Sequence, residues 1–145
     1  MKKLVVYDSN FGNTKLVAEV IAKELGKETG VVAVADLRDK DLEGVEGLVV
    51  GSPIIGWRPS ERMGSFLDGL KKEQLKGVRA TSFDTRVKLF IHGEAAEKIA
   101  KKLEVVGAKI LVKPEGFYVG GKEGPLLKGE IERARKWAGK IKEEW

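Results

Sequence analysis

The 145-residue sequence contains no cysteine and a single histidine. The absence of cysteine excludes disulfides, thiolate nucleophiles, iron–sulfur clusters and zinc sites built on cysteine. One histidine argues against a Ser-His-Asp triad and against a multi-histidine metal site. We therefore expect no catalytic residue and no metal site, and any redox chemistry would have to come from a bound organic cofactor.

Long hydrophobic runs are missing as well. No apolar segment approaches the roughly 20 residues that cross a bilayer. The N-terminal Met1-Lys2-Lys3 is followed by only a few apolar residues before Asp8, with no small-residue cleavage site after them. We expect a cytoplasmic protein without a membrane partner.

The composition is that of a folded domain with a modest basic surplus. Hydrophobic residues make up 42% and charged residues 34% of the sequence, which predicts a single globular domain over residues 1–145. Lys and Arg number 27 against 22 Asp and Glu, a net charge of +5 that either keeps the surface soluble or steers the protein toward an acidic partner. Basic and acidic side chains are interleaved along the helices, so we do not expect nucleic-acid binding.

Hydrophobic periodicity predicts strands and helices in alternation. Apolar runs predict five strands, at residues 4–7, 31–35, 48–50, 78–83 and 110–112, with Pro114 ending or bulging the last one. Helical spacing predicts helices at residues 14–25, 61–70, 94–106 and 130–142, the second of them capped by Ser60. This order indicates an α/β fold, a doubly wound parallel sheet of five strands in three layers. Ligands of such sheets bind beyond the carboxyl ends of the strands, so the loops after strands one, three and four are the candidates.

The loop after strand one reads Asp8-Ser9-Asn10-Phe11-Gly12-Asn13-Thr14 and leads directly into a helix. Free backbone N–H groups and the positive end of the helix meet there, which favours a phosphate. Gly12 allows close approach of the backbone, and Ser9, Asn10, Asn13 and Thr14 add side-chain donors. The loop matches neither G-x-G-x-x-G nor G-x-x-x-x-G-K-[ST]. A simple turn and helix cap is the alternative interpretation.

Residues 9–14 resemble the FMN-phosphate loop of the flavodoxin family, S/T-x-T-G-x-T, with Phe11 in place of the usual threonine. The resemblance implies a short-chain flavodoxin-like domain with strand order 2-1-3-4-5 and FMN as cofactor. It also implies an electron carrier, more than a stand-alone enzyme, that serves redox partner proteins as a monomer. Because the chain is basic, we expect its partner to present an acidic surface.

The segment after strand three, residues 51–59, resembles the flavodoxin segment that flanks the isoalloxazine ring. Trp57 has no obvious core to fill there, and it either meets a flavin or covers the start of the next helix. The resemblance makes Gly56 the hinge whose carbonyl accepts a hydrogen bond from N5 of the reduced flavin. It leaves both Ile55 and Trp57 as candidates for ring contact, and Pro53 and Ile54 complete the expected segment.

The segment after strand four, residues 82–93, corresponds to the flavodoxin loop that holds the pyrimidine side of the flavin. The resemblance implies cofactor contacts from Phe83, Asp84, Thr85 and Arg86, with backbone donors from Asp84 and Thr85. Arg86 either pairs with Asp84 or contacts the ring. Phe90 takes the place of the aromatic residue that stacks on the other face of the flavin.

Three other functions remain open from the sequence. A flavodoxin-like scaffold without FMN would act through protein contacts, as the departures at Phe11 and Phe90 allow. A phosphoacceptor receiver domain shares the strand order, and Ser82 and Lys113-Pro114 resemble its motifs, but Gly51-Ser52 stands where it needs an aspartate. A flavodoxin-like quinone reductase would be a longer chain with a nicotinamide site.

Overall fold

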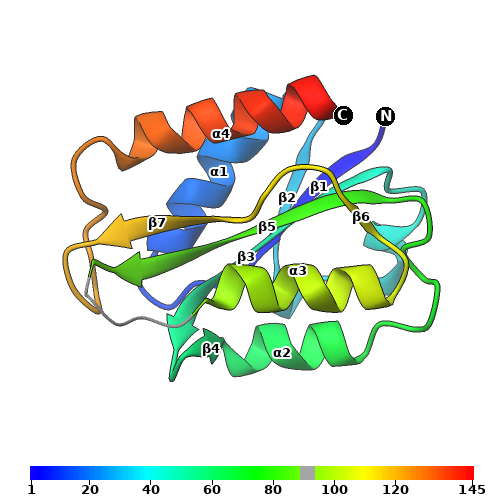
Figure 1. Ribbon diagram of the computed structural model, residues 1–145, viewed down its shortest axis with the longest axis horizontal. Helices are drawn as coiled ribbons and strands as arrows, with labels where there is room; N and C mark the ends of the chain where they lie inside the picture. The colour runs from blue at the N-terminus through cyan, green and yellow to red at the C-terminus, as the bar shows by residue number, and fades with distance from the viewer. Residues whose placement is uncertain (89–93) are drawn as a thin grey trace.

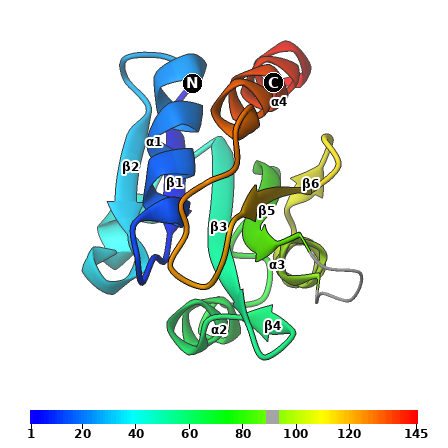
Figure 2. The same ribbon diagram turned by 90° about the vertical axis from the view of Figure 1, so that its left-hand side faces the viewer.

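A central β-sheet lies between two layers of helices in the computed structural model, which describes residues 1–88 and 94–145 (Figure 1). The strands are β1 (Lys3–Tyr7), β2 (Gly30–Ala33), β3 (Gly47–Ile55), β4 (Arg58–Pro59), β5 (Arg79–Val87), β6 (Lys109–Ile110) and β7 (Glu115–Val119). The helices are α1 (Asn13–Leu25), α2 (Glu61–Asp68), α3 (Ala95–Val105) and α4 (Glu130–Glu144), with 3₁₀ turns η1 (Val34–Asp36) and η2 (Asp39–Leu42). Figure 2 shows α1 and α4 on one face of the sheet and α2 and α3 on the other.

The strands of the main sheet run in the order β2-β1-β3-β5-β6, and all of these pairs are parallel. β7 pairs with β5 beyond the end of β6, so β6 and β7 together occupy the fifth position. The predicted order 2-1-3-4-5 is confirmed. β4 adds a short antiparallel pairing at the tip of β3.

Alternate residues of each strand enter two separate cores. In β1, Leu4 and Val6 pack toward α2 and α3, whereas Val5 packs toward α1 and α4. The same alternation in β3 sends Val50 to the first core and Val49 to the second. A parallel sheet covered on both faces requires such continuous apolar runs, which is why short apolar segments sufficed to predict these strands.

Strands β3 and β5 extend further than the sequence predicts, so the predicted strand ends were wrong. Residues 51–55 and 84–87 lie beyond the predicted strands, but they belong to β3 and β5. The two strands pair with each other as far as Pro53 and Thr85, and β5 pairs with β7 as far as Val87 and Val119. These segments remain in strands because the neighbouring strands satisfy their backbone groups.

The fifth strand is interrupted where Pro114 predicted an end or a bulge. β6 is only two residues long, and β7 begins at Glu115. The Thr81 hydroxyl donates to the Val112 carbonyl at 2.8 Å and so satisfies a backbone group inside the interruption.

In the described ranges, 1–88 and 94–145, no helix is both long and apolar enough to cross a membrane.

Candidate functional site

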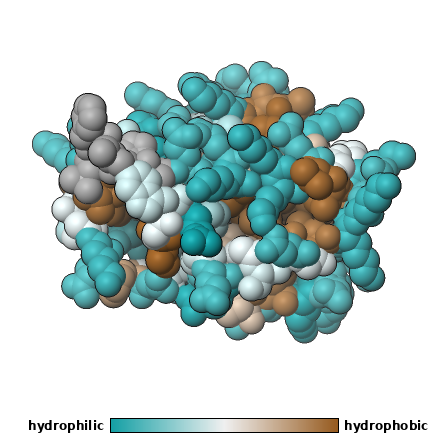
Figure 3. Space-filling model, turned by 60° about the horizontal axis from the view of Figure 1, so that its bottom comes forward, coloured by the Kyte–Doolittle hydropathy of each residue, from teal (hydrophilic) through white to brown (hydrophobic). Residues whose placement is uncertain are grey.

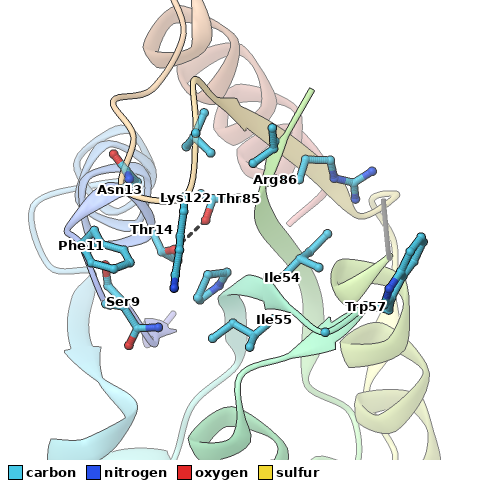
Figure 4. A pocket seen from close by; sticks show the side chains of 16 residues that line it. Ser9, Phe11, Asn13, Thr14, Ile54, Ile55, Trp57, Thr85, Arg86 and Lys122 are labelled. Carbon is cyan, nitrogen blue, oxygen red and sulfur yellow. Dashed lines mark hydrogen bonds between the residues drawn. The ribbon is translucent and has the colours of Figure 1, made fainter. Parts of the chain in front are cut away.

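A cleft of about 560 Å³ opens at the carboxyl edge of the sheet, a size typical of small-molecule sites (Figure 4). The first loop, the tip of β3, the end of β5 and the turn after β7 form its walls. The lining residues are Ser9, Asn10, Phe11, Asn13, Thr14, Pro53, Ile54, Ile55, Gly56, Trp57, Thr85, Arg86, Val87, Val119, Gly121 and Lys122.

The first loop places the start of α1 at this cleft. Gly12 has φ 92°, a left-handed conformation that glycine adopts without steric cost, and its amide donates to Ser9 Oγ at 3.0 Å. No side chain of the described residues caps the helix. The amides of Asn13, Thr14 and Lys15 belong to the first turn, where no intrahelical carbonyl accepts them. The loop therefore presents backbone donors and the positive end of a helix to an anion.

A pair of buried hydroxyls ties this loop to the middle of the sheet. Thr14 Oγ1 and Thr85 Oγ1 are 2.8 Å apart, and both side chains line the cleft (Figure 4). Thr14 is only 2% exposed. The pair joins the first turn of α1 to β5 and holds two hydroxyl groups beside the helix N-terminus.

The tip of β3 forms a two-residue hairpin with β4. Gly56 and Trp57 have φ 58° and 71°, both left-handed, as in a type I′ turn, and such a conformation is unusual for a bulky residue such as Trp57. Trp57 is 55% exposed and Ile55 46% exposed. Lys98 Nζ donates to the Trp57 carbonyl at 2.9 Å and anchors the hairpin to α3. The turn therefore holds an indole at the rim of the cleft.

Apolar side chains form much of the lining on either side of the cleft. Figure 4 shows Phe11 at the first-loop side and Trp57 at the hairpin side, with Ile54 and Ile55 between them. Phe11 is 49% exposed. A planar aromatic ligand would cover this exposed apolar surface.

The side chains of two predicted site residues, Phe83 and Asp84, do not line the cleft, and Asp84 lies in β5 and not in the predicted loop. Phe83 is fully buried and makes edge contacts with the rings of Phe117 and Trp137, at centroid distances of 6.0 and 6.2 Å. Asp84 is fully buried on the opposite face of β5 and accepts the Ala96 amide at 2.9 Å, at the start of α3. Phe83 and Asp84 lie deeper in β5, on opposite faces of the sheet, whereas Thr85, Arg86 and Val87 at its carboxyl end line the cleft.

Arg86 forms the ion pair that the sequence offered as one of two alternatives. Its Nε and Nη2 donate to the two carboxylate oxygens of Asp84 at 2.7 and 2.6 Å. Burial lowers the pKa of Arg86, but the hydrogen bond and the charge of Asp84 outweigh it and raise the pKa above its ordinary value. A side chain at Gly116 would overlap the guanidinium, so this glycine makes room for the pair. Arg86 also lines the cleft.

Asp8 performs a structural task next to the first loop. It is buried and accepts hydrogen bonds from the Ser60 hydroxyl at 2.5 Å and from the Ser9 amide at 3.0 Å. Arg62 Nη2 lies 2.9 Å from the same carboxylate and donates to Asn10 Oδ1 at 3.0 Å. The hydrogen bond and the charge of Asp8 raise the pKa of Arg62. Asp8 thus fastens the first loop to α2.

The cleft contains four residues that the sequence did not predict: Val87, Val119, Gly121 and Lys122. The sequence pointed to the loops after strands one, three and four, whereas Val119 ends the interrupted fifth strand and Gly121 and Lys122 follow it. A lysine between glycines at residues 120–124 was the one signal available.

The predicted stacking residue Phe90 lies outside the described residues. Ser82, considered as a receiver motif, is buried and donates to the Ala96 carbonyl.

Comparison with known proteins agrees with this geometry. Residues 4–113 match a family model described as a flavodoxin domain. A flavodoxin from the domain Archaea is 23% identical, with 99% of this chain and 97% of that chain covered and a TM-score of 0.79. Oxidised flavodoxin 1 from Bacillus cereus is 19% identical, with 100% and 99% covered and a TM-score of 0.83.

The same fold also occurs within a longer chain. The rubredoxin oxygen:oxidoreductase of Desulfovibrio gigas is 18% identical, and the match covers 98% of this chain but 35% of that one, at a TM-score of 0.78. At these identities the solved structures establish the fold, whereas the family model, which spans most of the sequence, establishes descent. The chain belongs to the flavodoxin family.

Proposed function

We propose that this chain binds FMN in the cleft and exchanges electrons with partner proteins. One observation carries the proposal: the uncapped start of α1 and the buried Thr14–Thr85 hydroxyl pair face the same cleft as the exposed apolar side chains. An anion site beside an apolar slot suits a ligand with a phosphate at one end and a flat ring at the other. Flavodoxins in general bind FMN, and these residues fit it.

Each part of the cleft has a separate task in this proposal. The amides of the first loop, with Ser9, Asn10, Asn13 and Thr14, hold the phosphate, and Pro53, Ile54, Ile55, Trp57 and Val87 enclose the ring. Bound FMN supplies one- or two-electron transfer. Apolar side chains exclude water from one side of the ring, and the backbone at Gly56 and Thr85 supplies polar partners at its edge. The Asp84–Arg86 pair holds β5 against α3 while Arg86 lines the cleft.

Titration with FMN and with riboflavin, followed by visible absorbance and fluorescence, tests the proposal. We expect one FMN per chain and much weaker binding of riboflavin, which lacks the phosphate. Thr14→Val should weaken FMN binding roughly ten- to a hundredfold, because a hydrogen bond to a charged group contributes about 1.5–3 kcal/mol. Thr14→Ser keeps a hydroxyl and is the matched control. Equal affinities for FMN and riboflavin would refute the phosphate site, and no binding of either would refute FMN as the cofactor.

The partner surface is proposed to be the basic end of the α2–α3 face, next to Trp57. Figure 3 shows this face to be hydrophilic over most of its area. Around a depression there, which also includes Trp57, the basic residues Arg58, Lys98, Lys101 and Lys102 outnumber the acidic Glu61 and Asp68, although Lys102 pairs with Asp68. An acidic partner would meet both the basic side chains and the rim of the cleft, and its association would slow as salt screens the charges.

A salt series with a reductase and two charge-reversal variants tests this surface. Lys101→Glu should slow reduction at low salt and flatten its salt dependence. Lys136→Glu makes the same charge change on α4, in the opposite helix layer, and should leave both nearly unchanged. Equal effects of the two variants would mean that only net charge matters.

We further propose that residues 1–145 act as one monomeric domain in the cytoplasm, and sedimentation at micromolar concentration tests the monomer.

A further inference from the structure

A tight turn after β7 carries Lys122 to the phosphate end of the cleft. The Gly124 amide donates to the Gly121 carbonyl at 3.0 Å, so residues 121–124 form a closed turn with Lys122 in its second position. The Gly120 amide donates to the Pro125 carbonyl at 2.8 Å, and Leu127 donates to Tyr118 at 2.9 Å. These bonds fix the base of the turn, so the backbone that bears Lys122 is held in place.

The turn is also fastened to the first loop. Asn13 Nδ2 donates to the Glu123 carbonyl at 3.1 Å, across 110 residues of sequence. A Cβ at Gly124 would lie 2.5 Å from the Asn13 amide group, so the turn packs directly against this side chain. Figure 4 shows the Lys122 side chain extending into the cleft on the side of Thr14 and Ser9, away from Trp57. Lys122 is thus placed beside the start of α1.

Within the part of the chain that the structure describes, the cleft offers Lys122 no acidic partner. Among the described residues that line the cleft, Arg86 and Lys122 are basic and none is acidic. The Arg86 charge is offset by Asp84, which its guanidinium contacts at 2.6 Å. Lys122 takes part in no ion pair within residues 1–88 and 94–145. Its ammonium group therefore adds to the positive end of α1.

We propose that Lys122 is a phosphate-binding residue that selects the phosphorylated flavin over its neutral analogue. This inference rests on the proposed FMN function. A phosphate monoester at neutral pH carries a charge of about −1.5 to −2, whereas riboflavin has an uncharged hydroxyl in its place. A lysine at this end of the cleft therefore stabilises bound FMN and contributes little to bound riboflavin. The Lys122 ammonium group also supplies a hydrogen-bond donor to the phosphate in place of the threonine hydroxyl that the first loop lacks at Phe11.

The experiment compares Kd for FMN and for riboflavin in wild type, Lys122→Met, Lys122→Arg and Lys128→Met. Lys128→Met is the matched control, because Lys128 is exposed in the same connection to α4 and does not line the cleft. We expect Lys122→Met to lower the preference for FMN about tenfold. The Kd for FMN should rise, and the Kd for riboflavin should stay unchanged. Lys122→Arg should keep most of the preference, and Lys128→Met all of it. Salt should weaken FMN binding less in Lys122→Met than in wild type.

Each outcome decides the proposal. Loss of FMN affinity with unchanged riboflavin affinity supports it. If wild type prefers FMN and Lys122→Met keeps that preference, the inference is overturned and the proposed function stands. Equal loss of both affinities also overturns it, because Lys122 would then act on the ring or on the fold. If wild type binds no FMN, the proposed function fails and the inference fails with it.

Discussion

The contact between Gly51 and Phe83 determines how closely β3 and β5 pack beneath the cleft. The two residues are paired across these strands, and the ring of Phe83 occupies the space that a side chain at Gly51 would need. A Cβ at Gly51 would lie 2.1 Å from Phe83 Cζ, whereas ordinary contacts are 3.4–4 Å. In the variant Gly51→Ala the ring or the strand would have to move by more than an ångström.

Little space is available for that movement. Phe83 is fully buried, and its ring meets the edges of Phe117 and Trp137. Overpacking of such a core costs about 1–3 kcal/mol, and the entropy that alanine removes from the unfolded chain returns about 0.4–1 kcal/mol. We expect Gly51→Ala to lower the free energy of unfolding by about 1–2 kcal/mol. Because Ser52 and Pro53 follow directly, FMN affinity should fall too.

Urea unfolding followed by circular dichroism measures the effect. Gly64→Ala is the control, because a Cβ there meets no atom within 4 Å in α2, and it should raise stability by about 0.5–1 kcal/mol. Phe83→Leu removes the obstructing ring edge. Its own cost should therefore be at least about 1 kcal/mol smaller in the Gly51→Ala background than in wild type. Unchanged stability of Gly51→Ala, or additive effects of the two changes, would refute this account of the packing.

Ser60, Glu130 and Trp57 provide three further tests. Ser60→Ala removes the hydroxyl that accepts the Met63 amide at 3.2 Å and donates to Asp8, so urea unfolding should show a loss of about 1–2 kcal/mol, and no loss would mean that the cap is dispensable. Burial opposes ionisation of Glu130, but Arg133 and the Tyr118 amide outweigh it and lower its pKa below the ordinary 4.5. The stability advantage of wild type over Glu130→Gln should therefore be full above about pH 4.5 and fade as the pH falls through the lowered folded-state pKa; an advantage independent of pH would contradict this. Trp57→Phe should reduce the fluorescence quench caused by FMN, and a quench as large as that of wild type would assign it to Trp137 or Trp145.

Local sequence signals predicted the order of the elements and several helix boundaries. Ser60 caps α2 as expected because a serine oxygen can reach a first-turn amide in its own segment. Trp137 packs in the core, as the apolar stripe of the last helix indicates. The lengths of β3 and β5 were not predictable in the same way. Asp84 looks like a loop residue until the Ala96 amide of α3 and the Arg86 guanidinium supply its hydrogen-bond partners.

The site residues likewise include some that local sequence predicts and others that tertiary packing alone brings to the cleft. The first loop was predictable because its donors, its glycine and its helix are contiguous in sequence. Lys122 was not, since it reaches the cleft only when the turn after β7 packs against Asn13. Phe83 and Asp84 were assigned to the cofactor by analogy, Asp84 through its backbone. In a strand that continues to Val87, their side chains are buried in the layers on opposite sides of the sheet. Of the described residues in that segment, Thr85, Arg86 and Val87 at the carboxyl end of β5 line the cleft.

The carboxylates near the cleft explain why an anion site can exist there. Asp8 adjoins the first loop and Asp84 adjoins Arg86, and either carboxylate left unpaired would repel an anion and would be costly to bury. Arg62 and Arg86 neutralise them, and both acids also accept backbone amides. These ion pairs fasten the first loop to α2 and β5 to α3 while cancelling the negative charge. The uncapped start of α1 and Lys122 then set the sign of the field at the first-loop end of the cleft, which favours a dianionic ligand.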